Sequence, residues 1–270
     1  MSLSLRLNVS VTGPLDAPPV VFVHGFGCGQ QMWRRVAPAV AADHRVVLLD
    51  LVGSGASDMS AYDSERYASL DGYVDDILGL LREMDLSDVA FVGHSVSAMI
   101  GVLAQLRAPE LVSRLVLVAP SARYVDDDGY VGGFSESDID DLLRMMDHNH
   151  LGWQNPLAGI VAGSGQGGDP AAAAELESSF CRTRPDIAHQ FATVTFRGDN
   201  RADLAGVDAP TLVLQSAIDA VAPPSAGRFV HEQIAGSVYE VIETVGHCPH
   251  LTAPAATTDA IRAFLTGTPA

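Results

Sequence analysis

Hydrophobic and polar positions repeat with two different periods along this chain. Short apolar runs occur at 20–23, 46–49, 89–92, 115–118 and 211–214, each bounded by polar or turn residues. Continuous runs of this length are typical of strands that are buried on both faces of a sheet. Between most of them, apolar residues recur at helical spacing. Strands that alternate with helices predict an α/β protein with a mainly parallel sheet.

The two ends of the chain extend this pattern. Residues 238–242 predict a last strand, and residues 256–265 a last helix. Further helices are expected at about 30–40, at 70–84 with Ser69 as the N-cap, and at about 225–234. Near the N-terminus, alternating apolar positions predict a half-buried strand at the edge of the sheet: Leu3, Leu5, Leu7, Val9 and Val11.

The alternation of strands and helices stops between residues 121 and 201. Amphipathic spacing predicts three helices there, around 139–146, from 169 through 180, and after Pro185. A helical insertion at this point could roof the sheet. We therefore expect an α/β core formed by residues 1–120 and 202–270, with a helical lid formed by residues 121–201.

Composition narrows the choice of partners and compartment. The formal net charge is −17, which disfavours a nucleic-acid or anionic-membrane partner. Three scattered cysteines suit a reducing compartment rather than a disulfide framework. The N-terminus lacks the pattern of a secretory signal, and no stretch approaches the ~20 apolar residues of a membrane span. We expect a cytoplasmic protein.

A candidate nucleophile lies in the run 89–101. The apolar strand breaks at Gly93 and resumes at Ser97 with small and apolar residues that fit a helix. Ser95 lies between them, at a tight strand-to-helix turn. Such a turn holds its central residue in a strained conformation and exposes its side chain at the edge of the sheet. Ser95 is therefore a candidate catalytic nucleophile.

Two more residues match what a serine nucleophile needs, a base and a group that orients the base. His247 follows the last predicted strand, and Asp219 follows the strand at 211–214. Catalytic side chains of such sheets cluster beyond the carboxyl ends of the strands. The chain order Ser, Asp, His is that of α/β-hydrolases. We expect Ser95, Asp219 and His247 to form a catalytic triad.

The assignments of the acid and of the base each have an alternative. Residues Asp126, Asp127 and Asp128 follow the preceding strand and are rivals for the role of the acid. His247 could instead join Cys248 and His250 at a metal, although no further group of ligands completes that set. We expect no metal site.

Oxyanion donors are expected at the backbone N–H groups of Phe26 and Val96, in the early loop and directly after the nucleophile. Gly25 and Gly27 let that loop approach closely. Another glycine run, 163–168, matches the dinucleotide-binding pattern G-x-G-x-x-G, but it lies within the insertion and follows no strand. We interpret it as a flexible loop.

Taken together, these motifs resemble the α/β-hydrolase family over essentially the whole chain, and within it the RsbQ-like branch that includes plant karrikin and strigolactone receptors. Ser97 departs from the general family pattern, which has glycine there, but matches the receptor form. The resemblance is carried by His24–Cys28, Asp50–Asp58, Arg66–Tyr67, Leu70–Tyr73, Gly93–Gly101, Gly132–Phe134, Arg184–Ala188 and Gly246–His250.

The resemblance implies a lid of four helices inserted after the sixth strand, and a triad that works without a cofactor. Members of this group slowly hydrolyse small hydrophobic esters or lactones. By the same resemblance, the substrate pocket would be lined by Phe26, Tyr124, Phe134, Trp153, Leu157 and Val194.

Three functions remain open at this point. The first is a serine hydrolase that cleaves a small hydrophobic ester or lactone through an acyl-enzyme. The second, implied by the resemblance alone, is an RsbQ-like ligand-sensing protein with slow hydrolase activity. It would activate a stress-response phosphatase and contact a signalling partner through its lid. The third is a cofactor-free haloperoxidase or C–C bond hydrolase, which can share the fold and the triad.

Overall fold

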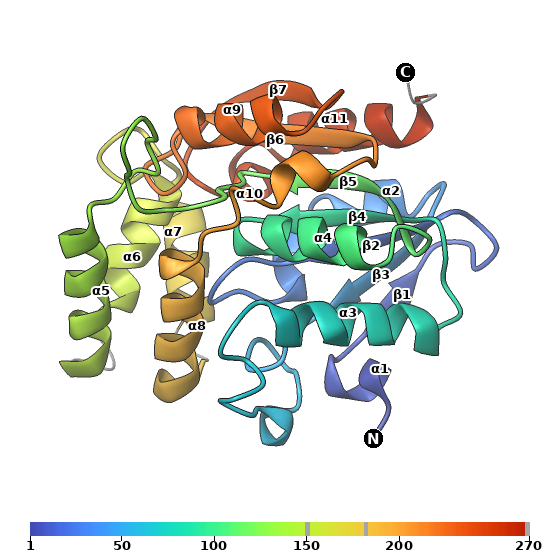
Figure 1. The fold of residues 1–270 in the computed structure, drawn as a ribbon, viewed down its shortest axis with the longest axis horizontal. Coiled ribbons are helices and arrows are strands. Elements are labelled where there is room, and N and C mark those ends of the chain that lie inside the picture. The colour runs from blue at the N-terminus through green and yellow to red at the C-terminus, as the bar shows by residue number, and fades with distance from the viewer. Residues whose placement is uncertain (149–151, 181–182, 268–270) are drawn as a thin grey trace.

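A seven-stranded sheet forms the centre of the molecule (Figure 1). The structure is a computed structural model that describes residues 1–148, 152–180 and 183–267. The strand order is β1-β3-β2-β4-β5-β6-β7, with β1 antiparallel to β3 and every other pair parallel. The predicted α/β fold with a mainly parallel sheet is confirmed. The strands are β1 Ser10–Thr12, β2 Pro19–Val23, β3 Arg45–Leu49, β4 Val89–His94, β5 Val112–Val118, β6 Thr211–Ile218 and β7 Val238–Val245.

The direction of winding reverses between β2 and β4. From β2 the chain crosses to β3 on one side, and β4 then starts the series on the other side. In open α/β sheets the crevice at such a reversal is the usual ligand site. Val23 pairs with Gly93 in the parallel register of these two strands. The segments that follow β2 and β4 therefore start side by side.

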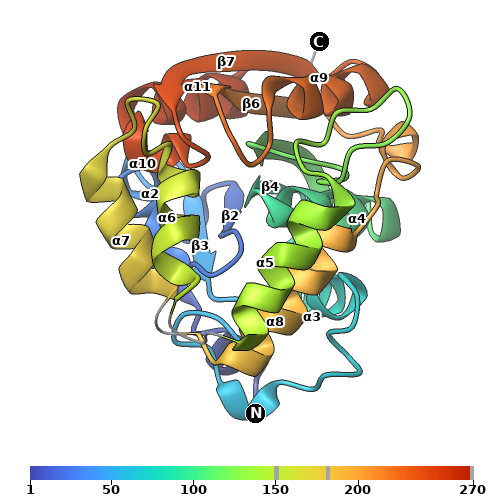
Figure 2. The same ribbon diagram turned by 90° about the vertical axis from the view of Figure 1, so that its left-hand side faces the viewer.

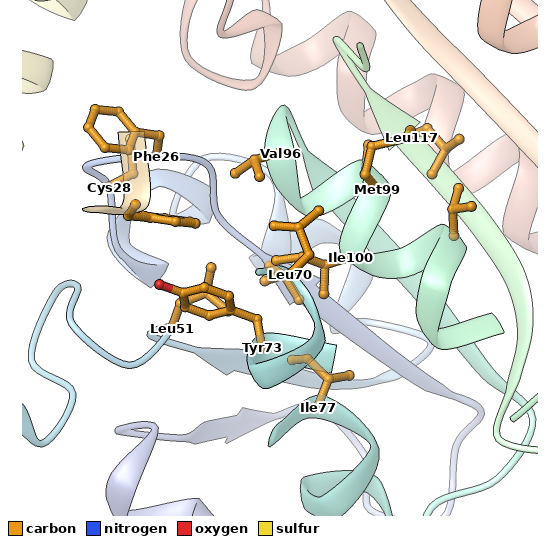
Figure 3. Close-up of a cluster of buried hydrophobic side chains, with 14 of the residues drawn as sticks. Phe26, Cys28, Leu51, Leu70, Tyr73, Ile77, Val96, Met99, Ile100 and Leu117 are labelled. Carbon is orange, nitrogen blue, oxygen red and sulfur yellow. The ribbon is translucent and has the colours of Figure 1, made fainter. Parts of the chain in front are cut away.

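Helices cover both faces of the sheet, and alternate strand residues are buried in two separate cores. Val21 and Val23 belong to one core, while Val20 and Phe22 belong to the other. Figure 3 shows part of the first core, in which α3 and α4 place Tyr73, Ile77, Met99 and Ile100. The helices are α3 Asp71–Glu83, α4 Val96–Arg107 and α9 Pro224–Gln233 on that face, α2 Ala37–Val40 and α11 Pro254–Thr266 on the other, and the short α10 Pro249–Thr252 after β7.

In the part of the insertion that the structure describes there are four helices, which Figure 2 shows from the front. Two of them, α6 and α7, lie together, and α5 lies beside α8. The insertion leaves the sheet after β5, the fifth strand, which agrees with the five strands that the hydrophobic pattern predicts before residue 121, whereas the resemblance implied six. Among the described helices, none is long and apolar enough to cross a membrane. The lid helices are α5 Glu136–His148, α6 Gln154–Ala162, α7 Pro170–Phe180 and α8 Pro185–Arg197.

The prediction of one edge strand over residues 3–11 is wrong. Residues Leu3–Arg6 form helix α1, and only the exposed strand β1 follows. The carboxylate of Glu83 accepts hydrogen bonds from the backbone N–H groups of Leu3 (2.6 Å) and Ser4 (2.9 Å). The first N–H groups of a helix have no hydrogen-bond partner within the helix. The carboxylate of Glu83 supplies that partner here, so a residue remote in sequence stabilises the helix.

The helix expected at 30–40 is divided into a 3₁₀ helix, Gln30–Trp33, and α2. Pro38 lies in the first turn of α2, where its missing N–H has no helical partner to lose. In the interior of one continuous helix over residues 30–40, the same proline would remove a hydrogen bond and interrupt the helix. Two more 3₁₀ turns, Met59–Ala61 and Leu204–Gly206, lie in connecting segments. The N-cap of α3 is Leu70, one residue after the predicted Ser69, although the hydroxyl of Ser69 accepts a hydrogen bond from the N–H of Asp71 at the start of the helix.

The packing of α4 against β4 generates a stability prediction. A Cβ atom on Gly93 would lie 2.3 Å from the carbonyl oxygen of Ser97, a backbone atom that cannot move alone. We expect Gly93→Ala to lower the free energy of unfolding by about 3 kcal/mol or more, measured by chemical denaturation. The control is Gly159→Ala in α6, where the new Cβ makes only ordinary contact with Ser164. Equal stability of the two variants would contradict this account.

Candidate active site

Ser95 occupies a strained backbone position between β4 and α4. Its φ is 58° and its ψ is −125°, a region that residues other than glycine rarely adopt. The N–H of Ser95 donates to the carbonyl oxygen of Val118 on β5 at 2.9 Å, which fixes the turn to the neighbouring strand. The turn predicted from the sequence is therefore present, with its strain at the candidate nucleophile.

Small residues allow the loop after β2 to lie against this turn. A Cβ on Gly25 would come within 2.6 Å of Nδ1 of His94 and 3.1 Å of the Cβ of Ser95. Ser97 is fully buried, and its hydroxyl donates to the carbonyl oxygen of His24 at 2.5 Å. The serine at position 97 thus ties the turn to the loop that carries Phe26, a bond that glycine could not make.

The structure brings the three predicted triad residues together in one buried hydrogen-bonded chain. His247 Nε2 lies 2.8 Å from Ser95 Oγ, and His247 Nδ1 lies 2.8 Å from Asp219 Oδ2. The other carboxylate oxygen of Asp219 accepts the N–H groups of Val221 (2.8 Å) and Ala222 (3.0 Å). Asp219 is thereby an acceptor at both oxygens, so the proton on His247 belongs to Nδ1 and Nε2 is free to accept.

The backbone of His247 is held from both sides. Its carbonyl oxygen accepts from Nε2 of His94 at 2.8 Å, and its N–H donates to the carbonyl oxygen of Val161 at 2.7 Å. Burial lowers the pKa of His94 well below its usual value, which keeps this imidazole neutral with its proton on Nε2. Val161 belongs to α6, so the lid contributes directly to the position of the imidazole.

The rival acids lie elsewhere. The carboxylate of Asp126 accepts the N–H groups of Gly132 and Gly133 within its own loop, and Asp127 pairs with Arg201. The N–H of Asp128 donates to the side chain of Asp127. Their hydrogen bonds order the segment that leads into the lid.

Side chains that can bind a metal gather next to His247, in a different set from the one considered in the sequence. Among the described residues, the ligand atoms of His94, Cys248 and His250 lie within 4.8 Å of one another and are buried. His94 already bonds to the backbone of His247, and the ring of His250 stacks on Trp33 at 4.5 Å. These contacts make the cluster a support for the loop of His247, while His247 itself faces Ser95.

The two predicted oxyanion donors lie in the expected segments. Val96 is the first residue of α4, where a backbone N–H has no partner within the helix. Phe26 follows β2, and Figure 3 shows it on the loop that lies beside the start of α4. Their donor role stays a prediction. The run 163–168 follows α6 and turns the chain toward α7 without any strand before it.

A small cavity adjoins Ser95 and His247. Its volume is about 20 Å³, close to the roughly 10–15 Å³ that one water molecule needs. Burial raises the pKa of Cys28 to about 12 and that of Cys248 well above its usual value, so both thiols stay protonated. The other lining residues are Phe26, His94, Leu157, Val161, Leu176, Phe180, Phe196 and Val221.

The predicted pocket residues separate into three groups. Phe26 and Leu157 line the cavity. Trp153 lies behind it, with its ring 6.0 Å from that of Phe26, and Tyr124 reaches Ser95 directly, with its hydroxyl 3.0 Å from Oγ. Phe134 lies outside the cavity lining, where its ring contacts that of Phe196.

Val194 does not line the cavity either, and instead borders a surface groove beside α8 together with His189. Its α8 neighbours Phe191 and Phe196 turn inward, and both rings lie near that of Phe26, at 5.7 and 6.0 Å. The helical period of α8 was visible in the sequence, but the period alone did not say which of its apolar residues face the cavity.

Several lining residues were missed from the sequence. Leu176 and Phe180 recur at the i, i+4 spacing of one helix face in α7, a signal that was available. Cys28 adjoins the predicted oxyanion loop and Cys248 follows the predicted base, so proximity to the motifs could have identified both. Val161 offered no such signal, because the end of α6 reaches the site only through tertiary packing.

The chain matches the model of the Alpha/beta hydrolase family over residues 20–260. It is 38% identical over 256 residues to Karrikin insensitive 2 receptor IA of Petunia hybrida, covering 94% of this chain and 92% of that protein. It is also 38% identical to Strigolactone esterase D14 of Arabidopsis thaliana, covering 92% of each. Among solved structures, olei00960, a hydrolase from Oleispira antarctica, matches with a TM-score of 0.93 and 37% identity, over 98% of this chain and 97% of that one. The chain belongs to the α/β-hydrolase family and is similar to the karrikin and strigolactone receptor branch.

Proposed function

We propose that this protein is a serine hydrolase that cleaves small hydrophobic esters or lactones through an acyl-enzyme. The observation that carries the proposal is the chain of two 2.8 Å hydrogen bonds from Ser95 through His247 to Asp219. This is the arrangement in which a base accepts a serine proton and a carboxylate fixes the base's tautomer. All three residues are buried, which limits competition from bulk water for these bonds.

In the proposed reaction, Ser95 Oγ attacks the acyl carbon while its proton passes to Nε2 of His247. The imidazolium, stabilised by Asp219, returns that proton to the departing alkoxide. Water then attacks the acyl carbon, gives a proton to His247, and Oγ regains its proton as the acyl group leaves as an acid. The N–H groups of Phe26 and Val96 would bind the carbonyl oxygen as it gains charge in both steps.

The lining of the cavity supports an apolar substrate. Beside the reacting groups, it consists of aromatic and aliphatic side chains, two protonated thiols and the neutral imidazole of His94. No arginine or lysine lines the cavity among the described residues, so an acidic substrate has no counter-charge there. The names of the relatives agree with this class, since one is a strigolactone esterase.

A second candidate function is ligand sensing with slow turnover. The cavity holds about 20 Å³, so any ester or lactone must displace aromatic side chains or move the lid before it reaches Ser95. A site that opens only for its ligand couples binding to a change in the lid surface, which a signalling partner could read. Relatives named as receptors support this candidate.

Replacing the nucleophile is the first test. We expect Ser95→Ala to reduce hydrolysis of p-nitrophenyl acetate by roughly 10⁴-fold or more, because no other group can form the acyl-enzyme. The measurement is kcat with purified protein, with circular dichroism as the control for folding. Retention of the wild-type rate would remove the proposed nucleophile.

The orienting acid has a separate test. Asp219→Asn keeps the size of the side chain but cannot hold His247 in the required tautomer, so we expect kcat to fall about 10²- to 10⁴-fold. The matched control is Asp126→Asn, another carboxylate that accepts two backbone N–H groups but lies away from His247. Similar losses in the two variants would contradict the role given to Asp219.

The third test separates ester from lactone and turnover from capture. Intact-protein mass spectrometry would follow incubation with p-nitrophenyl butyrate and, separately, with a synthetic butenolide. We expect an acyl adduct on Ser95 with both compounds, absent from Ser95→Ala, short-lived with the ester and longer-lived with the butenolide. Adducts from the ester alone would restrict the substrate class to esters, and adducts from neither would contradict the proposal.

A further inference from the structure

The hydroxyl of Ser95 has a second side-chain partner, which the triad mechanism does not use. The hydroxyl of Tyr124 lies 3.0 Å from Ser95 Oγ, while His247 Nε2 lies 2.8 Å from the same atom. Tyr124 is only 2% exposed, and Ser95 is 5% exposed. Two polar groups therefore converge on one serine oxygen in a closed site.

The direction of each bond follows from the acceptors around it. Asp219 accepts from Val221, Ala222 and His247, which leaves the proton of His247 on Nδ1 and makes Nε2 an acceptor. Ser95 must then donate its proton to Nε2. Its oxygen retains lone pairs, so Tyr124 is the donor to Oγ.

Two features keep this donor in place. The backbone carbonyl of Tyr124 accepts the N–H of Phe134 at 3.1 Å, and the Tyr124 ring lies edge-on to Phe196 with centroids 5.2 Å apart. Burial raises the pKa of Tyr124, so the hydroxyl keeps its proton at neutral pH. If Tyr124 served only to pack against Phe196, its aromatic ring would suffice and the hydroxyl would not be needed.

We propose that Tyr124 is a catalytic residue whose hydroxyl donates to Ser95 Oγ, slowing acylation and accelerating deacylation. The proposal rests on the proposed hydrolase function. Its basis is the change in the strength of Oγ as a hydrogen-bond acceptor during each step. A serine hydroxyl is a good hydrogen-bond acceptor, and the same oxygen is a poorer acceptor once it bears an acyl group.

Transfer of the proton to His247 by itself would strengthen the bond from Tyr124, but formation of the bond to the acyl carbon has the larger and opposite effect, since the ester oxygen of the acyl-enzyme is a poorer acceptor than the free hydroxyl. The bond to Tyr124 consequently weakens over the course of acylation. It strengthens again in deacylation, when the C–Oγ bond breaks and the electron pair returns to Oγ. A donor at this oxygen stabilises the free enzyme relative to the acylation transition state. It stabilises the deacylation transition state relative to the acyl-enzyme.

The test is Tyr124→Phe, which keeps the ring and its contact with Phe196. With p-nitrophenyl acetate in stopped flow, we expect acylation to become about 2- to 10-fold faster and deacylation slower by a similar factor, as one buried hydrogen bond allows. A larger burst of p-nitrophenol should precede a slower steady state. The control is Tyr130→Phe, which removes a hydroxyl that donates to the carbonyl of Arg123 in the same segment and should leave both rates unchanged.

A fluorophosphonate probe gives a second readout that needs no turnover. Labelling of Ser95, followed by mass spectrometry, should be faster in Tyr124→Phe than in the wild type. Equal labelling rates, or two half-reactions that change in the same direction, would overturn the role of Tyr124 and leave the hydrolase intact. Failure of the probe to label Ser95 in the wild type, together with no ester hydrolysis, would instead overturn the proposed function.

Discussion

The conformation of Ser95 is the constraint on which the rest of the site depends. A non-glycine residue at φ 58° and ψ −125° costs on the order of 1–3 kcal/mol, so the surrounding structure must hold it there. The hydrogen bond from its N–H to Val118, the absence of a side chain at Gly93, and the bond from Ser97 to His24 all do so. The same contacts draw the loop of Phe26 against the turn, so the strained conformation of the candidate nucleophile and the position of the loop beside the cavity depend on one set of interactions.

The sequence predicted this part of the molecule well because its determinants are local. Buried parallel strands appear as short apolar runs, and a tight turn needs glycine and serine at fixed offsets, as at Gly93 and Ser97. Asp219 and His247 could be identified because chemistry and topology restrict them to the ends of β6 and β7. The alternating residues at the N-terminus led to a wrong prediction of a strand. The residues form helix α1 instead, whose first backbone N–H groups donate to the carboxylate of Glu83 at the end of α3.

The pocket was predicted less completely because its lining depends on how four helices turn against each other. Val194 and Phe196 are two residues apart on α8, yet the first borders a surface groove and the second lines the cavity. Likewise, the carbonyl of Val161 accepts from the N–H of His247, although nothing in the sequence of α6 marks that carbonyl. Such contacts arise from tertiary packing, and periodicity carries no information about them.

The hydrogen bond from the N–H of His247 to the carbonyl of Val161 also links the lid to the candidate base. If α6 moved to admit a ligand, the N–H of His247 would lose its partner, while the bond from His94 to the carbonyl of His247 would remain. The aromatic rings that fill the cavity oppose that movement, since the ring of Phe26 lies 5.7–6.2 Å from four others. Aromatic pairs contribute about 0.5–1.5 kcal/mol each beyond burial, so a ligand must replace these contacts before it gains affinity. Under the proposed function, such a site would favour rigid apolar ligands that restore the lost contacts, and the displacement of these rings would be part of the cost of every turnover.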